Sequence, residues 1–308
     1  MSEKKIIFMG TPDISSIYLN SLIEKKYNIV GVYSQPPRKK NRGMLISQSP
    51  VQKLALLNNI KTFTPLNFKN NKTLIEIKSL KPDIIIVMGY GLKLPNLILD
   101  LPRLGCINLH VSLLPRWRGA APIEYSLLNG DLKTGITIFK LVEEMDAGPI
   151  IASETIIIDK NINKGDLINN LNVIGTKLLI SKLPDIFNQK IVYRKQDKKE
   201  ITYANKINTD TRKLDFNENI EIIKNKIRAF SPQPSAWFFY KKERIKIIKS
   251  SFVKGDWNSS MIIDNKFNIG CKDGKVCPEI IQREGKKPMH LDDFLKGFKF
   301  KINTEVNA

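Results

Sequence analysis

Histidine and cysteine are both scarce in this chain, and each shortage narrows the chemistry that it can perform. The 308 residues include two histidines, His110 and His290, so few side chains can titrate near neutral pH. The three cysteines, Cys106, Cys271 and Cys277, contain no C-x-x-C pair and cannot all be bridged. They predict neither a disulfide framework nor a metal site, and they indicate a protein of the reducing cytoplasm.

Long apolar runs are also missing. No segment approaches the roughly 20 consecutive apolar residues of a membrane span, so we expect no membrane partner. The opening M-S-E-K-K-I-I-F-M-G lacks the apolar region and cleavage site of a signal peptide. The first strand-like run leads into G-T-P-D-I and not G-x-G-x-x-G, which removes the main support for a dinucleotide cofactor.

Acidic residues are few beside basic ones. The chain has 50 Lys and Arg against 30 Asp and Glu, a formal net charge of +20. A compositional bias toward Lys, Asn and Ile is one explanation, but the basic residues also cluster. Arg38, Lys39, Lys40 and Arg42 fall within five residues, and residues 190–250 hold 16 basic against 7 acidic side chains. Such clusters favour phosphate backbones, so the charge predicts a nucleic-acid partner.

The first half alternates strand-like apolar runs with runs of helical spacing, which predicts an α/β domain around a mainly parallel sheet. The run D-I-I-I-V-M at 83–88 is typical of a strand buried on both faces. The expected strands are residues 5–9, 29–33, 83–88, 105–110, 135–141 and 150–158, and the expected helices are 14–24, 121–128 and 164–187.

The second half has a different texture. A polar, Lys-rich stretch with little periodicity predicts an interdomain linker at 190–208 that still crosses a surface. It separates an α/β domain, residues 1–189, from a small β-rich domain, residues 209–308, for which we expect a barrel. The elements expected there are a helix at 220–230, strands at 237–240, 244–250, 261–264 and 267–271, and a turn at 272–275.

Three residues form the candidate catalytic group. Asn108 and His110 are two apart at the end of an apolar strand, so both side chains point to the same side. Asp146 follows the expected strand 135–141 and can reach His110 if the two strands are neighbours. Acyl transfer to an amine needs an oxyanion donor, a base and a charge that orients the base. Taken singly, each also has a structural explanation: a capping Asn, a packed His and a turn Asp.

The loop after His110 offers further candidates. Trp117, between Arg116 and Arg118, is either an exposed amphipathic loop or an element that stacks on and binds an RNA end. The turn 112–115 predicts a rigid wall, and Gly89-Tyr90-Gly91 predicts backbone that a ligand approaches closely.

Several of these motifs, in this order, resemble those of methionyl-tRNA formyltransferases. The strongest is N-L-H-V-S-L-L-P-R-W-R-G-A-A-P-I at 108–123. The others are G-T-P-D at 10–13, Q-P-x-R-x-x-x-R-G at 35–43, Y-G-L-x-L-P at 90–95, T-G-I-T-I at 134–138 and I-R-A-F-x-P-x-P at 227–234, with the spacing from His110 to Asp146. The resemblance covers residues 4–250 well and the rest loosely.

The resemblance implies a Rossmann-like catalytic domain and a C-terminal tRNA-binding domain similar to an OB barrel; the widely separated histidines and the cysteine spacing predict no metal. The formyl group of 10-formyltetrahydrofolate would pass to the methionyl amine of initiator tRNA. By motif, Asn108, His110 and Asp146 become catalytic. The folate site would comprise Ser112, Leu113, Leu114 and Pro115 with Met88, Gly89, Tyr90, Gly91 and Leu92, helped by backbone at 143–146. The tRNA site would include Arg38, Lys39, Lys40 and Arg42.

The chain departs from the usual pattern at three places. Val111 replaces a common Gly, Pro149 ends D-A-G-P where D-x-G-D is commoner, and K-K-N makes the basic loop more cationic. None removes a catalytic residue. We expect a monomer, and a 38–43 loop that is mobile without RNA. Two other functions stay open: a nucleotide-sugar N-formyltransferase using the same folate donor, and a non-catalytic RNA-binding protein on the same scaffold.

Overall fold

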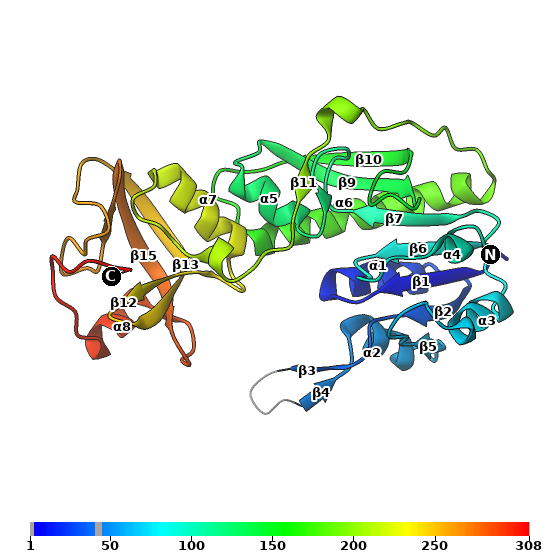
Figure 1. Ribbon diagram of the computed structural model, residues 1–308, viewed down its shortest axis with the longest axis horizontal. Helices are drawn as coiled ribbons and strands as arrows, with labels where there is room; N and C mark the ends of the chain where they lie inside the picture. The colour runs from blue at the N-terminus through cyan, green and yellow to red at the C-terminus, as the bar shows by residue number, and fades with distance from the viewer. Residues whose placement is uncertain (1–2, 41–44, 308) are drawn as a thin grey trace. The chain divides into compact units, whose positions relative to one another are not determined.

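The computed structural model describes residues 3–40 and 45–307, which form two compact units (Figure 1). Unit 1 comprises Met1–Gly119, Thr134–Ile156 and Asn169–Tyr203. Unit 2 comprises Ala120–Lys133, Ile157–Ile168 and Ala204–Ala308. Each unit is therefore built from segments that are distant in the sequence.

The core of unit 1 is a seven-stranded sheet in the order β10-β9-β7-β6-β1-β2-β5. Neighbouring strands from β7 to β5 run parallel, whereas β9 runs antiparallel to β7. This confirms the mainly parallel α/β sheet. The strands are β1 (Ile6–Gly10), β2 (Ile29–Tyr33), β5 (Thr62–Phe63), β6 (Ile84–Met88), β7 (Cys106–His110), β9 (Lys133–Lys140) and β10 (Ile150–Ile157).

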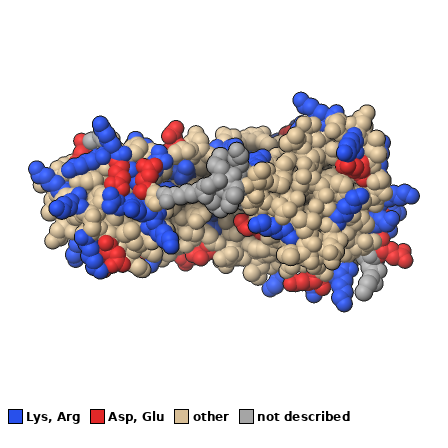
Figure 2. All heavy atoms as spheres, turned by 90° about the horizontal axis from the view of Figure 1, so that it is seen from below, with Lys and Arg blue, Asp and Glu red and all other residues tan. Residues whose placement is uncertain are grey.

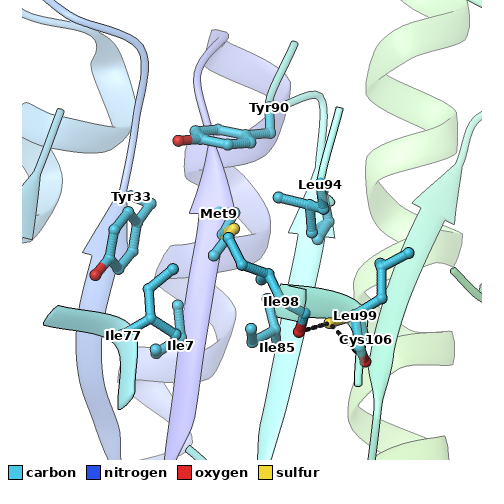
Figure 3. Close-up of a cluster of buried hydrophobic side chains, with 11 residues drawn as sticks. Ile7, Met9, Tyr33, Ile77, Ile85, Tyr90, Leu94, Ile98, Leu99 and Cys106 are labelled. Atoms are coloured by element: carbon cyan, nitrogen blue, oxygen red, sulfur yellow. Dashed lines mark hydrogen bonds between the residues drawn. The ribbon is translucent and has the colours of Figure 1, made fainter. Parts of the chain in front are cut away.

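Both faces of this sheet are buried, as the continuous apolar runs predict. On one face, Ile7 and Met9 of β1 and Ile85 of β6 pack in a cluster with residues such as Ile77 and Ile98 (Figure 3). Alternate residues of a strand point to opposite faces, and every residue of β1 and β6 is buried. The sheet therefore presents side chains to water chiefly at its edges, and the carboxyl ends of the parallel strands meet at one of them.

Two helices of unit 1, α2 (Pro50–Leu57) and α3 (Asn71–Ser79), begin at side-chain caps. Ser49 accepts a hydrogen bond from the Gln52 N–H at 3.0 Å and precedes Pro50, while Asn70 accepts one from the Thr73 N–H at 3.2 Å. The helices that lie wholly or mostly in unit 1 are α1 (Asp13–Glu24), α2 (Pro50–Leu57), α3 (Asn71–Ser79), α4 (Asn96–Leu99) and α6 (Lys164–Phe187). A hairpin of β3 (Arg38–Lys40) and β4 (Leu45–Ser47) follows β2 (Figure 1).

Unit 2 pairs two helices, α5 (Pro122–Leu128) and α7 (Ile220–Phe230), with an antiparallel sheet in the order β12-β13-β15-β14. Its strands are β12 (Ala236–Tyr240), β13 (Glu243–Lys254), β14 (Ile269–Cys271) and β15 (Gly274–Arg283), and β16 (Met289–His290) pairs with β15. Unit 2 ends with helix α8 (Leu291–Gly297). The β-rich C-terminal domain is confirmed, with the sheet open as half of a barrel.

Two expectations for unit 2 need correction. Residues 261–264 are not a strand: Met261 and Ile262 each make an isolated bridge to another segment. The strand β15, beginning at Gly274, has no counterpart in the sequence prediction because Pro278 interrupts its apolar pattern. Its register against β13 shifts next to that proline, between Lys249 and Ser250, which is how a bulge admits a residue with no N–H.

The remaining elements are short. They are β8 (Arg118–Gly119), β11 (Tyr203–Ala204) and two 3-10 helices at Lys198–Glu200 and Asp210–Arg212. Among the described residues, no helix is both long and apolar enough to cross a membrane.

Candidate active site

Strand β7 presents Asn108 and His110 at the carboxyl edge of the parallel strands. β7 lies between β6 and β9: Asn108 is opposite Val87 and Phe139, and His110 is opposite Thr137. The two residues are two apart, so their side chains share one side of the sheet. His110 is the last residue of the strand. In sheets of this class, that edge is where ligands bind.

The imidazole of His110 is held in one orientation. The residue is 6% exposed, and its Nε2 lies 2.8 Å from the carbonyl oxygen of Trp117. A carbonyl oxygen can only accept, so Nε2 carries a proton and donates it. The ring also meets Phe139 edge-on, with centroids 6.4 Å apart. Nδ1 is therefore the nitrogen that remains for chemistry.

Asp146 approaches that nitrogen from the loop between β9 and β10. Because β9 is the direct neighbour of β7, the condition for their approach is met. Asp146 Oδ2 lies 3.8 Å from His110 Nδ1 and accepts the Gly119 N–H at 2.8 Å. The backbone of Asp146 is left-handed, with φ +52°. An L-residue adopts this conformation at a cost, so its surroundings must hold it.

The amide of Asn108 has a buried atom without a protein partner. Its Oδ1 is excluded from solvent and makes no hydrogen bond to any residue that the structure describes. Burying an amide oxygen unpaired costs about 1–3 kcal/mol, which is why native proteins rarely leave one so. An unpaired amide oxygen two residues from His110, on the same side of the sheet, can accept a hydrogen bond from a ligand.

The turn 112–115 is braced by a threonine of β9. Thr137 Oγ1 donates to the Ser112 carbonyl at 2.7 Å and accepts the Leu114 N–H at 3.1 Å. Ser112 Oγ donates to the Arg116 carbonyl at 2.6 Å. The structure thus makes this turn a fixed wall beside His110.

Residues 88–92 expose backbone at the same edge. Gly89 and Gly91 have φ of +57° and +82°, and a Cβ on Gly91 would lie 2.3 Å from Gln35 Nε2. Tyr90 between them is 2% exposed, and its carbonyl accepts the Thr11 hydroxyl at 2.9 Å. Met88 is also 2% exposed, so this segment offers main-chain groups rather than large side chains.

The basic loop is described in part. Residues 38–40 form β3, where the exposed Arg38 donates to Gln35 Oε1. Arg42 lies outside the described residues, as does the middle of the 38–43 loop for which we expect mobility.

Arg118 has a different role from the RNA contact considered for it. Its side chain is 3% exposed, and its guanidinium donates to Gln196 Oε1 and Glu144 Oε1, so it is not available to a phosphate. Arg116 lies with its Cζ 4.4 Å from the ring centroid of Trp117.

Sequence reasoning also missed three contributors, namely the Trp117 carbonyl, the Gly119 N–H and Gln196. The first two are main-chain groups, to which residue type gives no clue. The third stands in a Lys-rich polar stretch in which nothing distinguishes it. Among the described residues, no group of three His, Cys, Asp or Glu side chains could hold a metal ion.

These groups together suit acyl transfer to an amine. A proton acceptor, a carboxylate beside it and an amide donor lie at one open edge of a sheet, next to exposed backbone. Neither a nucleophilic Ser nor Cys is in the group, because Ser112 Oγ is committed to a carbonyl and Cys106 is 1% exposed. Burial raises the pKa of the Cys106 thiol to about 12, which keeps it unreactive.

Comparison with known proteins gives matches over nearly the whole chain. Residues 4–183 match the family described as formyl transferase, and residues 206–299 match the formyl transferase C-terminal domain. The methionyl-tRNA formyltransferase of Ehrlichia canis is 41% identical over 300 residues, which cover 96% of this chain and 97% of that protein. That of Pelagibacter ubique is 40% identical over 296 residues, with 96% of each chain covered.

Solved structures share the fold at lower identity. A sugar 3N-formyl transferase, solved with dTDP and 5-N-formyl-THF, has a TM-score of 0.66 and 23% identity, covering 93% of this chain and 100% of that chain. An N-formyltransferase from Helicobacter canadensis, in complex with folinic acid and dTDP-3-aminofucose, has a TM-score of 0.68 and 23% identity, with coverage of 89% and 99%.

Proposed function

This chain belongs to the formyl transferase family, and we propose that it transfers the formyl group of 10-formyltetrahydrofolate to the α-amino group of initiator methionyl-tRNA. The product is N-formylmethionyl-tRNA, which starts translation. The observation that carries this proposal is identity of 40–41% with methionyl-tRNA formyltransferases over 96% of the chain. The two sugar N-formyltransferase structures have 23% sequence identity to this chain, a level at which the likeness shows a shared fold and not a shared substrate.

His110 and Asp146 would move the proton of the reaction. The amine nitrogen forms a bond to the formyl carbon, the bond from that carbon to folate N10 breaks, and one proton passes from the amine to N10. Because the Nε2–H of His110 is committed to Trp117, Nδ1 is the ring atom that faces this transfer. Asp146 Oδ2, 3.8 Å away, would orient the ring and keep Nδ1 directed at the site.

Asn108 would stabilise the charge that develops on the formyl oxygen. Its Nδ2 is the end of the amide that can donate to that oxygen, and it is carried on the buried strand β7; Oδ1, which is buried without a partner among the described residues, can only accept and is open to an N–H or O–H of a ligand. A donor that is already oriented lowers the barrier more than it strengthens ground-state binding.

We place the folate along the wall 112–115 and the backbone of 88–92. The residues of that site would be Ser112, Leu113, Leu114, Pro115, Met88, Gly89, Tyr90, Gly91 and Leu92. Two observations support this placement: the exposed main chain at Gly89 and Gly91, and the turn braced by Thr137. Exposed peptide groups suit the polar edge of a pterin-like ring system, and the fixed turn excludes water from one side of it.

The basic residues would bind the tRNA. On unit 1, Arg38, Lys39, Lys40 and Arg42 are the candidates. On unit 2, a cation–aromatic patch lies over β12 and β13, where Trp237 is paired with Lys246 and Phe239 with Arg244. Opposite residues in an antiparallel pair share one face, so all four side chains lie together.

The patch contains cations that are not neutralised. Arg244 Cζ lies 4.6 Å from the Trp237 ring centroid, and Arg244 Nε is buried without a partner among the described residues. Lys213 Nζ lies 6.0 Å from the same ring. Burial, and then the charges of Arg212 and Arg244, lower the pKa of Lys246, while Glu284 opposes them. Binding of an anion such as a phosphate would relieve this crowding of positive charge.

The proposed function divides the chain into three parts. Residues 1–189 would bind folate and catalyse the transfer, residues 190–208 would link the two domains, and residues 209–308 would contact tRNA. Lys and Arg side chains are scattered over the face seen in Figure 2, with Asp and Glu side chains among them, and the net charge of +20 suits a polyanionic substrate. We also propose a monomer that works in the cytoplasm, where tRNA is charged, with no membrane partner.

The first test is formyl transfer from 10-formyltetrahydrofolate to initiator methionyl-tRNA, run beside elongator methionyl-tRNA and free methionine. Transfer to the initiator alone supports both the chemistry and the role of the basic surface. Folate binding without transfer to any of the three would move the assignment to an amino-sugar acceptor. RNA binding without folate turnover would point to a non-catalytic protein.

A further inference from the structure

We propose that Gln196 is a positioning residue for the reaction: it clamps the backbone of the Asp146 loop, and Arg118 sets the orientation of its amide. The inference rests on the proposed function, because it gives Gln196 a role through Asp146. Gln196 lies in the polar segment that the sequence presents as a linker. The structure places it in unit 1, half-buried against the loop between β9 and β10.

The amide nitrogen of Gln196 spans the loop. Nε2 donates to the Asp146 carbonyl at 2.7 Å and to the Gly148 carbonyl at 2.8 Å. A primary amide has two N–H groups, so both are used. One of these carbonyls is that of Asp146 itself, and the other lies two residues later in the same loop. The two hydrogen bonds therefore restrain the backbone that carries the Asp146 carboxylate.

Arg118 determines which way the Gln196 amide points. Gln196 Oε1 accepts from Arg118 Nε at 3.1 Å and from Nη2 at 2.9 Å. A guanidinium only donates, so it can face the oxygen of the amide and not the nitrogen. The NH2 is thereby directed at the two carbonyls. Arg118 Nη1 donates to Glu144 Oε1 at 3.0 Å, so the buried arginine also holds the start of the same loop.

The Asp146 loop needs such a clamp because its reactive shape is strained. A left-handed backbone brings the Cβ of a non-glycine residue close to the following carbonyl oxygen, and Asp146 has φ +52°. Relaxation to a right-handed or extended conformation would carry Oδ2 away from the Gly119 N–H and from His110 Nδ1. The two hydrogen bonds from Gln196 hold the backbone of this loop and so oppose that relaxation.

The clamp also ties Asp146 to the segment that holds His110. Trp117 accepts from His110, and its own N–H donates to Thr202 Oγ1 at 2.9 Å. The Arg118 N–H donates to the Thr202 carbonyl at 2.9 Å. Residues 117–119 and 196–202 thus form one frame that holds the imidazole and the carboxylate at a fixed separation. Catalysis is sensitive to that separation, since a shift of about 1 Å can cost about 100-fold in rate.

Two substitutions test the clamp. Gln196→Met keeps the shape and removes all four hydrogen bonds, while Gln196→Glu keeps the acceptor for Arg118 and loses both donors. Both should lower kcat by about 10- to 100-fold and leave KM for either substrate within about threefold. The matched controls are Gln189→Met and Gln189→Glu, at an exposed glutamine of unit 1 just after α6, which should retain full rate.

A double-mutant comparison separates positioning from general stability. If Gln196 works through Asp146, adding Gln196→Met to Asp146→Ala should cost less than about twofold, because the group that it positions is already gone. Costs that multiply would overturn the proposal, as would a full rate for both Gln196 variants in an enzyme whose wild type formylates initiator tRNA.

A measurement without turnover keeps the clamp testable if the proposed function fails. The chain has two histidines, so ¹⁵N-histidine labelling gives ring signals from only two residues, His110 and His290. Movement of Asp146 changes the charge near His110 Nδ1, so Gln196→Met should shift that signal and leave His290 in place. An unmoved His110 signal in the folded variant would overturn the clamp, whatever the substrate proves to be.

Discussion

The Nε2 atom of His110 lies 2.8 Å from the carbonyl oxygen of Trp117, and this contact determines which face of the imidazole is reactive. The carbonyl has no proton to give, so the neutral ring carries its hydrogen on Nε2 and a lone pair on Nδ1. Asp146 Oδ2 then stands 3.8 Å from Nδ1, where it can orient the ring for proton transfer at that atom.

The first prediction is therefore a tautomer. In ¹⁵N-histidine-labelled protein, His110 should show a protonated Nε2 and, in its neutral form, a bare Nδ1. His290 is exposed on β16 and serves as the internal control, because its ring should exchange freely between tautomers. A neutral His110 with its proton on Nδ1 would contradict both the Trp117 contact and the proton path drawn from it.

Asn108→Ala should lower the single-turnover rate of formyl transfer by about 10²- to 10³-fold, because one oxyanion donor is lost. Folate and tRNA affinities should change little, since the hydrogen bond from Asn108 to the formyl oxygen becomes strong only when negative charge develops on that oxygen in the transition state. The control is Asn172→Ala: Asn172 lies in α6 and also has a buried Oδ1 without a partner among the described residues. A normal rate for Asn108→Ala would remove Asn108 from the mechanism.

Gly148→Ala should impair both folding and activity. A Cβ at Gly148 would lie 1.7 Å from the Lys140 carbonyl oxygen, so the loop that carries Asp146 must move. The matched control is Gly297→Ala, where a Cβ meets no described atom within 4 Å, so stability should stay within about 0.5 kcal/mol of wild type. Thermal unfolding and kcat measured on the two variants decide it, and a wild-type rate for Gly148→Ala would show that the loop tolerates displacement.

The sequence predicts the sheet of unit 1 well because its strands are continuous apolar runs. The bounds of α6 and α7 agree with the expected 164–187 and 220–230, since both have long helical periodicity. The short elements α2, α3 and β5 were not predicted: their patterns span nine residues or fewer, and tertiary packing decides such segments. The strand β15 was not predicted either, because Pro278 interrupts the apolar pattern of its sequence.

The sequence predicts which residues belong to the candidate site, but it does not predict most of the contacts between them. Spacing alone puts Asn108 and His110 on one side of a strand, but the approach of Asp146 depends on the pairing of β7 with β9. Main-chain groups such as the Trp117 carbonyl carry no signal in the sequence. Arg118 looks like a surface cation beside Trp117, yet the fold buries it because Gln196 and Glu144 satisfy its donors.

Tyr33→Phe should raise the free energy of unfolding by about 1 kcal/mol at neutral pH, because the Tyr33 hydroxyl is buried without a partner among the described residues. Burial, and then the charges near it, raise the pKa of Tyr33. The unfolded chain loses this proton near pH 10 while the folded chain keeps it, so stability falls as pH rises above about 10. Tyr33→Phe should make that fall shallower.

Tyr18→Phe is the matched control for this prediction. Burial raises the pKa of Tyr18 also, so its removal should again flatten the alkaline loss. Its hydroxyl, however, donates to the Leu171 carbonyl at 3.4 Å, so at neutral pH the variant should lose stability and not gain it. Denaturant unfolding at pH 7 and at alkaline pH separates the two effects. Equal neutral-pH losses in both variants would contradict the unpaired state of Tyr33.

The last prediction concerns the cation–aromatic patch of unit 2. Neutralising one cation that contacts phosphate should release about one fewer counterion on binding, so Arg244→Gln or Lys246→Gln should each lower the salt slope of tRNA affinity by about one unit. The rate at saturating tRNA should stay near wild type, because neither residue belongs to the group proposed to bind folate or to move the proton.

Lys249→Gln is the control on the same strand, because its charge is already paired with Glu279 at 2.9 Å. Loss of a paired, exposed lysine should leave the slope almost unchanged, so the comparison isolates phosphate contact from net charge. An equal fall for Lys249→Gln would mean that tRNA responds to the overall field of the chain. An unchanged slope for Arg244→Gln and Lys246→Gln would mean that tRNA does not reach the patch, and the basic residues of unit 1 would then have to account for the salt dependence.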